Sequence, residues 1–503
     1  MNGFNKRKLL SIIAVTIIIL ALPLTLILVK HQNEIRTRAA APDQLEAEGG
    51  VLGGNAKIQT DSLASGGNYV ALGTNQTPTP TPITQTGTTY TVPSTIDKTG
   101  ATDVSSALNN WIASLPNGTA ANPTNIVFPS GAVYKLGAGG SIFVNNRSYL
   151  VFSGYGATIK ATGGGNVTDS AFIIGNSAPS HDIKIKGFTL IGANPDGGTP
   201  YAYHVGAESQ MGIELYSHPG AYNIEIFDNT ITDMYGHGGY VRSDSPPYPD
   251  NINIHNNVFR REGLMGWAFT NGTNLKFNDN QVYDSGLTPL DFEDGSAGEP
   301  LQHVQVERNL FDTWEWWHPV SNISSMTATN PSTVTTSSPH HLASGQEVAF
   351  FGHSGITNGW KYGAQITVIN ATQFTIPIQG TAGSGGTVEV WFTPHVISGD
   401  GGTGMIWNDF LIDSNIMRHG SPNPTNMVGA QDGQFSFWGS DTKTNFTVTN
   451  NVSELPVEGW ANRFQSMSTF NFTHNTFPGI SGGATDEVAH IVNSTNVISA
   501  PNP

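Results

Sequence analysis

One short phrase recurs along the chain and limits what the chain can fold into: two apolar residues separated by one residue, then two further residues and an asparagine. The copies end at Asn229, Asn257, Asn280, Asn309, Asn415, Asn451 and Asn475, and an earlier copy ends at Gly187. The steps between these ends are 42, 28, 23, 29, 106, 36 and 24 residues. Alternation of apolar and polar residues inside each copy predicts a strand. Because one unit is too short to bury its own apolar face, neighbouring units must stack.

The stack is predicted to be a β-helix of short parallel strands. An asparagine at a fixed place suits an inward ladder at a tight bend, where its amide bonds the coils above and below and its backbone tolerates the left-handed conformation. The repeats resemble those of right-handed parallel β-helix proteins of the pectate lyase-like superfamily. This resemblance covers roughly residues 91–322 and 395–500. It implies an all-β solenoid but no single reaction, because that superfamily holds lyases, hydrolases, epimerases and non-catalytic spikes.

The start of the predicted solenoid has its own signature. Residues 97–112 contain Thr-Gly-Ala-Thr-Asp and resemble the segment of that superfamily in which an amphipathic helix covers the N-terminal end of the solenoid. Asp103 is a suitable N-cap for this helix. Its apolar face is predicted to consist of Val104, Ala107, Leu108 and Trp111.

The N-terminus is predicted to be a membrane anchor. Residues 9–29 carry no charge and are long enough to span a bilayer. Three basic residues at 6–8 predict that the N-terminus lies inside and the rest of the chain outside. A cleaved signal peptide is the alternative. Either way we expect a cell-surface or secreted protein.

The net charge of −16 argues against nucleic acid as a partner and against anionic membrane surfaces. It also disfavours polyanionic ligands unless a cation such as Ca²⁺ mediates. No other cofactor is indicated.

The chain divides into six predicted segments. They are a cytoplasmic tip, anchor and stalk (1–42), a segment resembling a truncated carbohydrate-binding module of the family 6 and 35 type (43–74), a Thr/Pro linker (75–90), the first part of the β-helix (91–322), an inserted small β module (323–394) and the second part of the β-helix (395–503). The inserted module resembles the β module named for the first catalytic-cysteine half-domain of ubiquitin-activating enzymes, and its short β runs predict a small barrel.

Carboxylates supply the best candidates for chemistry. A second strand precedes several of the asparagine phrases, and placing its apolar residues inside points Glu214, Asp291, Glu293 and Trp438 outward. Asp291 and Glu293 are two residues apart on one face, so that their Cα atoms lie about 6.6 Å apart. Such a pair could act as acid and base in glycoside hydrolysis. Asp294 could complete an acidic trio or a Ca²⁺ site; the alternative is a solvated junction between strand and turn.

Basic residues give a second set of candidates. His237 and Arg242 follow an asparagine phrase. Asp233, Arg261 and Asp284 each lie four residues past an asparagine, which predicts a charge ladder across adjacent coils. In β-helix lyases an Arg or Lys abstracts the proton α to a uronate, so the resemblance offers Arg242 or Arg261 as a base and Asp284 as a weak Ca²⁺ ligand. A purely structural ladder is the alternative.

Aromatic residues indicate sugar binding. Trp314, Trp316 and Trp317 fall within four positions, and Trp438 is predicted to face outward. Aromatic faces suit the apolar faces of sugar rings. The alternative is that these rings pack in a loop or against the inserted module.

Together these features predict a membrane-anchored surface protein that acts on polysaccharide, as a glycoside hydrolase or a polysaccharide lyase. A non-catalytic carbohydrate-binding surface protein or adhesin is the alternative. An enzyme requires that the carboxylates and the aromatic residues converge in one cleft.

Overall fold

The computed structural model describes most of the chain beyond residue 86. The described residues are 56–60, 68–72, 87–166, 168–198, 206–217, 220–313, 321–340, 342–346, 348–354, 359–360, 365–390, 396–419, 434–453, 462–476 and 490–499. None of the helices within these ranges has the length and apolar composition that a membrane span requires. The predicted anchor at residues 9–29 lies outside them.

The chain forms two compact units, residues 1–85 and 86–503. In the first, the described residues form an antiparallel pair of strands, β1 (Ala56–Thr60) and β2 (Asn68–Leu72). Both strands fall in the segment predicted to resemble a carbohydrate-binding module.

In the second unit the chain winds through successive coils, and each coil adds strands to three columns of parallel strands, named A, B and C. Column A contains β3 (Thr88–Thr91), β5 (Thr124–Val127), the first half of β8 (Ser148–Ala161) and of β10 (His181–Ile191), β12 (Tyr222–Phe227), β15 (Asp250–His255), β18 (Gly272–Asn278), β21 (Pro300–Glu307), β31 (Ile406–Asp413), β34 (Lys443–Thr449), β37 (Met467–Thr473) and β39 (Thr495–Ser499). Column B contains β4 (Thr99–Asp103), β6 (Val133–Leu136), the second halves of β8 and β10, β13 (Thr230–Thr232), β16 (Val258–Arg260), β19 (Gln281–Tyr283), β22 (Leu310–Thr313), β32 (Ile416–His419) and β35 (Val452–Ser453).

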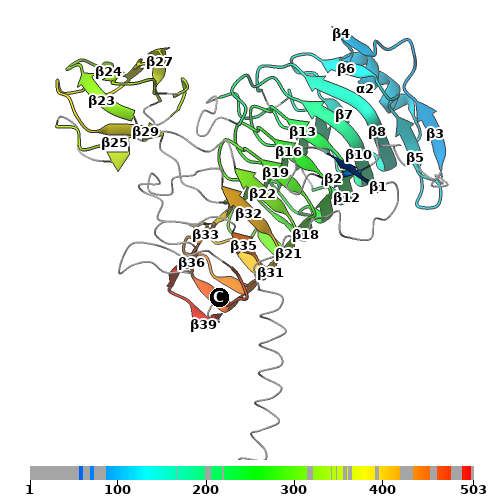
Figure 1. Cartoon of the computed structure of the whole chain (residues 1–503). Coiled ribbons are helices and arrows are strands. Elements are labelled where there is room, and N and C mark those ends of the chain that lie inside the picture. Colours follow the sequence, from blue (N-terminus) through cyan, green and yellow to red (C-terminus); the bar gives the residue numbers. More distant parts are fainter. Residues whose placement is uncertain are drawn as a thin grey trace, which may run out of the picture. The chain divides into compact units, whose positions relative to one another are not determined.

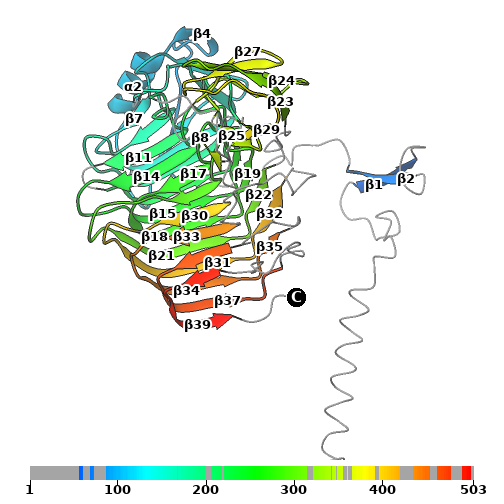
Figure 2. The same ribbon diagram turned by 90° about the vertical axis from the view of Figure 1, so that its left-hand side faces the viewer.

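Column C contains β7 (Ile142–Val144), β9 (Phe172–Ile174), β11 (Ile213–Ser217), β14 (Gly239–Ser243), β17 (Trp267–Phe269), β20 (Leu290–Phe292), β30 (Ile397–Asp400), β33 (Phe435–Trp438), β36 (Asn462–Gln465) and β38 (His490–Val492). Figure 1 shows columns A and B in sequence order, and Figure 2 shows column C. The predicted all-β fold with parallel sheets is therefore confirmed as a parallel β-helix. Its right-handed sense stays a prediction.

Apolar side chains of all three columns fill the inside of the coils and form one continuous core. Aromatic rings repeat from coil to coil: the rings of Phe410 and Phe446 stack with centroids 4.3 Å apart, and Phe269 stacks on Phe292 at 5.7 Å. This core explains the regular alternation in the column A strands that carry the repeated phrase, such as β12, β15 and β21, which bury alternate residues.

The predicted asparagine ladder is present at the bend between columns A and B. The backbone N–H and the side-chain Nδ2 of Asn257 both donate to Oδ1 of Asn280, at 3.0 and 3.1 Å, and Nδ2 also donates to the carbonyl of Ile226. The same pattern links Asn280 to Asn309. Every amide in this buried row therefore ties one coil to the next.

The prediction that the ladder asparagines take the left-handed conformation is wrong in detail. The residue before each asparagine takes it instead, with φ of 56° at Asp228, 54° at Asn256 and 56° at Asp279. The reason is directional, because the asparagine side chain must point inward to bond its neighbours, and the turn of the backbone is made one residue earlier.

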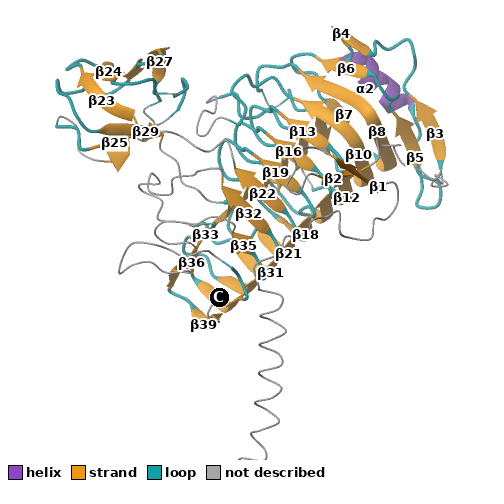
Figure 3. Ribbon diagram, in the orientation of Figure 1, coloured by secondary structure: helices purple, strands orange, loops and turns teal. Residues whose placement is uncertain are grey.

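The predicted cap helix is α2 (Ser105–Ser114), which contacts β7 of column C (Figure 3). Two details differ from prediction. Val104 occupies the N-cap position, while the Asp103 carboxylate accepts the N–H of Ser105 at 2.9 Å. The buried face is formed by Ser105, Leu108 and Ile112, and Ala107 is exposed. Leu108 and Ile112 are four residues apart, so they lie on one face of the helix.

Residues 321–390 form a separate antiparallel sheet with its own core around Val334, Phe350 and Phe374. Its strands are β23 (Ser321–Met326), β24 (Ser332–Thr336), β25 (Val348–Phe351), β26 (Gly359–Trp360), β27 (Thr367–Asn370), β28 (Gln373–Ile376) and β29 (Thr387–Val390). The β-helix resumes after it, because β30 pairs with β20 and β31 with β21. In the described part of this sheet no pairing joins β26 to β27, so closure into a barrel stays a prediction.

Candidate active site

The outward face of column C carries two rows of side chains from successive coils. The first row is Glu214, Tyr240, Ala268, Asp291, Ser398 and Ser436, which are paired in register. The second row lies two residues further along each strand and is Tyr216, Arg242, Thr270, Glu293, Asp400 and Trp438. Neighbours in a row stand about 4.8 Å apart, and the rows about 6.6 Å apart. The sheet therefore gathers on one face residues that are far apart in the chain.

A pocket of about 270 Å³ opens on this face. Four residues selected from the sequence line it together: Glu214, His237, Arg242 and Glu293. His237 lies just before β14 and reaches the pocket from the turn that precedes the strand. The structure thus brings together a carboxylate pair and two basic residues in one pocket.

Glu293 is the centre of the contacts in this pocket. His237 Nε2 lies 3.9 Å from Glu293 Oε1, and the imidazole stacks on the Tyr240 ring with centroids 5.4 Å apart. Burial lowers the pKa of His237, so that it is neutral near pH 7. Its Nδ1 is buried without a hydrogen-bond partner among the described residues. Thr270 Oγ1 lies 3.2 Å from Glu293 Oε2 and 2.9 Å from the Tyr240 hydroxyl.

Three carboxyl groups on this face hold their protons unusually tightly. Burial, together with the charges of Glu293 and Asp400, raises the pKa of Asp291 well above its ordinary value, although the Ser398 hydroxyl donates a hydrogen bond to it. Burial raises the pKa of Glu214 to about 7. Burial, with the nearby Asp294 carboxylate, raises the pKa of Asp400 to about 6. Asp291 is therefore a protonated acid beside the half-exposed Glu293.

Glu214 makes the folding stability depend on pH. Its folded pKa of about 7 is above its ordinary value of 4.5, so the folded state binds more protons between these two pH values. The contribution to stability is fully present below pH 4.5 and is lost as the pH rises through about 7. At 1.36 kcal/mol per pKa unit the effect is about 3 kcal/mol. We expect Glu214→Gln to flatten urea-unfolding free energies between pH 5 and 8; an unchanged slope would contradict the assignment.

Lys443 lies beside the acidic end of the second row. Its Nζ donates to the carbonyl of Trp438 at 2.7 Å and lies 5.4 Å from the centroid of the Trp407 ring. Burial lowers the pKa of Lys443 to about 8, while Asp441, Asp400 and Asp294 act in the opposite direction. Near pH 7 its positive charge stabilises the ionised form of Asp400.

We expect Lys443→Met to raise the pKa of Asp400 further above 6, because the variant removes the cation that favours the carboxylate. The measurement is a ¹³C NMR titration of carboxyl groups. Lys276→Met, which removes a lysine from the outer face of column A, serves as the control. A titration of Asp400 that is unchanged in Lys443→Met would show that the two groups do not interact.

The remaining basic and acidic candidates lie elsewhere. Arg261 sits after column B in the turn that leads to column C, where its Nε donates to Asp233 Oδ1 at 2.8 Å. Asp233, Arg261 and Asp284 all have left-handed φ, of 58°, 62° and 50°. The three residues therefore occupy equivalent places in successive coils, and Asp233 and Arg261 form an ion pair; a charge ladder that extends to Asp284 stays a prediction. Arg261 does not line the pocket described above.

The two Ca²⁺ candidates are also separated. Asp284 precedes β20 and is buried, whereas Asp294 follows β20, is exposed and accepts the N–H of Gly402 at 3.4 Å. Within the described ranges no three His, Asp or Glu side chains are placed to hold a metal ion. Calcium binding stays a prediction that these side chains do not support.

Among the tryptophans, Trp438 is 44% exposed and lies beside Asp400 at the end of the second row. Its contact with a sugar stays a prediction. Trp314, Trp316 and Trp317 lie outside the described residues.

The sequence reasoning missed Tyr216, Tyr240 and Asp400. The first two lie on strands that had been recognised, and the alternation in 240–243 was sufficient to point Tyr240 outward. Asp400 gave no such signal, because the inserted residues separate β30 from the strand with which it pairs.

No family model and no curated protein matches this chain. Solved structures that resemble it include ORF18 of Geobacillus virus E2 (14% identity, 81% of this chain and 60% of that chain, TM-score 0.30). Another is the catalytic unit of a GH87 α-1,3-glucanase from Streptomyces thermodiastaticus (14% identity, 79% of this chain and 67% of that chain, TM-score 0.35). A third is PfbA, a surface adhesin of Streptococcus pneumoniae (10% identity, 82% of this chain and 91% of that chain, TM-score 0.37). The chain spans 60% of the viral protein. At these scores the likenesses carry no argument about function.

Proposed function

We propose that this protein is a glycoside hydrolase that acts on a neutral polysaccharide outside the cell. The observation that carries the proposal is the gathering on column C of the buried Asp291 and the carboxyl groups of Glu293 and Asp400, beside a pocket of about 270 Å³. Sheet geometry sets the Cα atoms of Glu293 and Asp400 about 5 Å apart, and those of Asp291 and Asp400 about 8 Å. Side chains on strands at this spacing can reach the carboxyl separations of glycosidases, which are about 5 to 5.5 Å in retaining and about 6.5 to 9.5 Å in inverting enzymes.

In this mechanism Asp291 donates its proton to the glycosidic oxygen as the bond from that oxygen to the anomeric carbon breaks. Glu293 or Asp400, as the carboxylate, either attacks the anomeric carbon or takes the proton of an attacking water. Burial keeps Asp291 protonated at a pH at which an ordinary aspartate is ionised. Tyr216 and Trp438 offer rings for the sugar on either side of the reacting centre.

Charge in the pocket favours a neutral substrate. Glu208, Glu214 and Glu293 line it. Arg242, the one basic side chain with a permanent charge in the lining, is paired with Asp244 through Nε at 2.9 Å. A uronate would therefore meet carboxylates and no unpaired cation.

A lyase reaction is less well supported. Burial acts to lower the pKa of Arg242, but the contacts with Tyr240, Asp244 and Tyr216 together outweigh it and raise that pKa overall. Arg242 therefore stays protonated and is a poor base. The exposed Trp438 also suits a binding protein without activity, which the same experiment tests.

The test is incubation of the detergent-solubilised full chain with neutral and acidic polysaccharides, with and without Ca²⁺. New reducing ends without unsaturated-uronate absorbance are the expected result. Absorbance that depends on Ca²⁺ would replace the hydrolase by a lyase. No product, with retardation of the protein in polysaccharide-containing gels, would favour the surface-binding protein. The action outside the cell rests on the N-terminal sequence, which is proposed to anchor the chain.

A further inference from the structure

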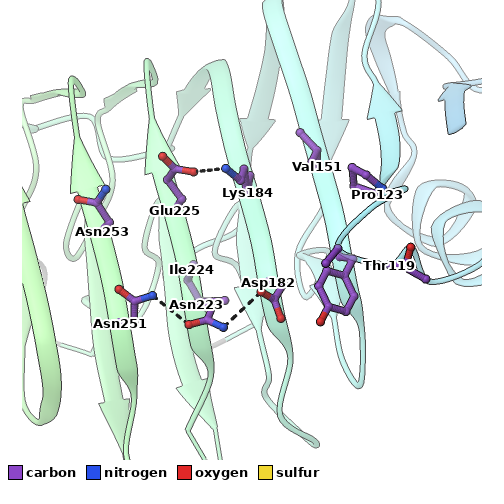
Figure 4. A pocket seen from close by; sticks show the side chains of 12 residues that line it. Thr119, Pro123, Val151, Asp182, Lys184, Asn223, Ile224, Glu225, Asn251 and Asn253 are labelled. Atoms are coloured by element: carbon purple, nitrogen blue, oxygen red, sulfur yellow. Dashed lines mark hydrogen bonds and ion pairs between the residues drawn. The ribbon is translucent and has the colours of Figure 1, made fainter. Parts of the chain in front are cut away.

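A second pocket lies on column A, among the first coils of the β-helix and on a different sheet from the candidate active site. Its volume is about 640 Å³. Figure 4 shows that Asp182, Asn223 and Asn251 lie side by side along one edge of it, one from each of β10, β12 and β15. A second line of side chains runs parallel to this edge, two residues further along each strand.

The edge is a chain of amide hydrogen bonds on the surface. Asn223 Nδ2 donates to Asp182 Oδ1 at 3.2 Å, and Asn251 Nδ2 donates to Asn223 Oδ1 at 2.9 Å. All three residues have left-handed φ, between 52° and 54°. Each asparagine amide has a second N–H donor that this row does not use. The coils thus present repeated, preorganised donors at a spacing of about 4.8 Å.

In the second line the charged groups are satisfied within the protein. Lys184 Nζ lies 2.6 Å from Glu225 Oε2, and His255 Nε2 lies 3.1 Å from Glu225 Oε1. Asp182 is likewise paired with His181 Nδ1 at 2.6 Å. No unpaired charge is therefore offered to a ligand by these groups.

Asn253 continues the second line and differs from its neighbours. It lines the pocket, is half-buried, and its side-chain amide makes no hydrogen bond to any described residue. On the other side of the pocket Tyr149, Val151 and Pro123 supply apolar surface. Free amides opposite an aromatic and apolar wall match a ligand with hydroxyl groups along its edges and C–H groups on its faces.

We propose that this column A pocket binds a neutral oligosaccharide segment and is a carbohydrate site separate from the candidate active site. Paired charges exclude strong attraction for uronates or phosphates, and amides both donate to and accept from hydroxyl groups. Binding here needs no catalysis, so the inference does not depend on the proposed hydrolase function.

The test is isothermal titration of neutral hexasaccharides (cellohexaose, xylohexaose, mannohexaose and maltohexaose) and of hexagalacturonate into the full chain in detergent. A Glu293→Gln background prevents turnover during the titration. Asn253→Ala is expected to weaken one class of sites about 3- to 10-fold, because one or two hydrogen bonds are lost. Asn253→Trp fills the pocket with an indole and is expected to remove one equivalent of bound neutral sugar.

Asn471 provides a matched control. It lies in the same row of column A, on β37, outside the pocket, and its side chain makes no hydrogen bond to any described residue. Asn471→Ala and Asn471→Trp are expected to leave affinity and stoichiometry unchanged. Unchanged binding in Asn253→Trp, or binding of hexagalacturonate alone, or no binding of any hexasaccharide, would overturn the proposal. Loss of one equivalent in Asn253→Trp together with no hydrolysis by the unsubstituted chain would support this site and refute only the hydrolase.

Discussion

Glu293→Gln and Asp291→Asn are each expected to slow polysaccharide hydrolysis by about a hundredfold to ten-thousandfold, the usual worth of general acid–base catalysis. Glu293→Gln removes a carboxylate that an amide cannot replace as a nucleophile or a base. Asp291→Asn removes the proton that the leaving oxygen must receive. The measurement is kcat and KM from reducing-end formation, and kcat is expected to carry the loss.

The dependence of kcat on pH distinguishes the acid role of Asp291 from the carboxylate role of Glu293. In the unsubstituted chain, activity is expected to fall as the pH rises through the raised pKa of Asp291, because only the protonated form donates. In Asp291→Asn the residual activity is expected to be low and no longer to fall as the pH rises through this range. Asp409→Asn, a change of the same kind at an exposed position on column A, is the control. Rates within tenfold of the unsubstituted chain in both active-site variants would refute the assignment.

Asn280→Ala is expected to lower the free energy of unfolding by about 3 to 5 kcal/mol. Oδ1 of Asn280 accepts two hydrogen bonds from Asn257, and its Nδ2 donates to Ile254 and Asn309. Alanine leaves a buried backbone N–H and a buried carbonyl with fewer partners, at about 1 to 3 kcal/mol each, and leaves a small cavity. The measurement is denaturant unfolding followed by circular dichroism.

The matched control is Asn253→Ala, one coil away. That asparagine lies on the outward face and makes no hydrogen bond to a described residue. Its replacement is expected to change stability by less than about 0.5 kcal/mol. If both variants lose the same stability, the loss does not come from the ladder.

The fold could be predicted from the sequence because every coil of the β-helix repeats the same pattern of strand, bend and strand. Every copy of the phrase places two apolar residues inside and one asparagine at the bend. The structure of one coil therefore applies to the coils that end at Asn229, Asn257 and Asn280. The position of the left-handed residue could not be predicted, because each bend contains several polar residues. Which of them takes the left-handed conformation depends on the inward direction of the asparagine side chain. The helix face was misassigned at Ala107 because it depends on where the helix begins.

The candidate site could be predicted where it followed from alternation within one strand. Glu214, Asp291 and Glu293 face outward on those grounds alone. Asp400 and Lys443 could not be found this way, because their neighbours are set by pairing between coils across an insertion. The burial that raises the pKa of Asp291 is likewise a property of the assembled coils.

The bend between columns A and B fixes where the chain can change in length. In the coils of the asparagine ladder two residues make that bend, for example 228–229, 256–257 and 414–415. The connection from B to C is residues 233–238, 261–266 and 284–289 in three successive coils, and then becomes residues 314–396 and 420–434. In the coils of the asparagine ladder, the longest additions therefore lie in the connection that leads into column C. Evolution can therefore change the length of the chain that enters column C without disturbing the asparagines that hold the coils together.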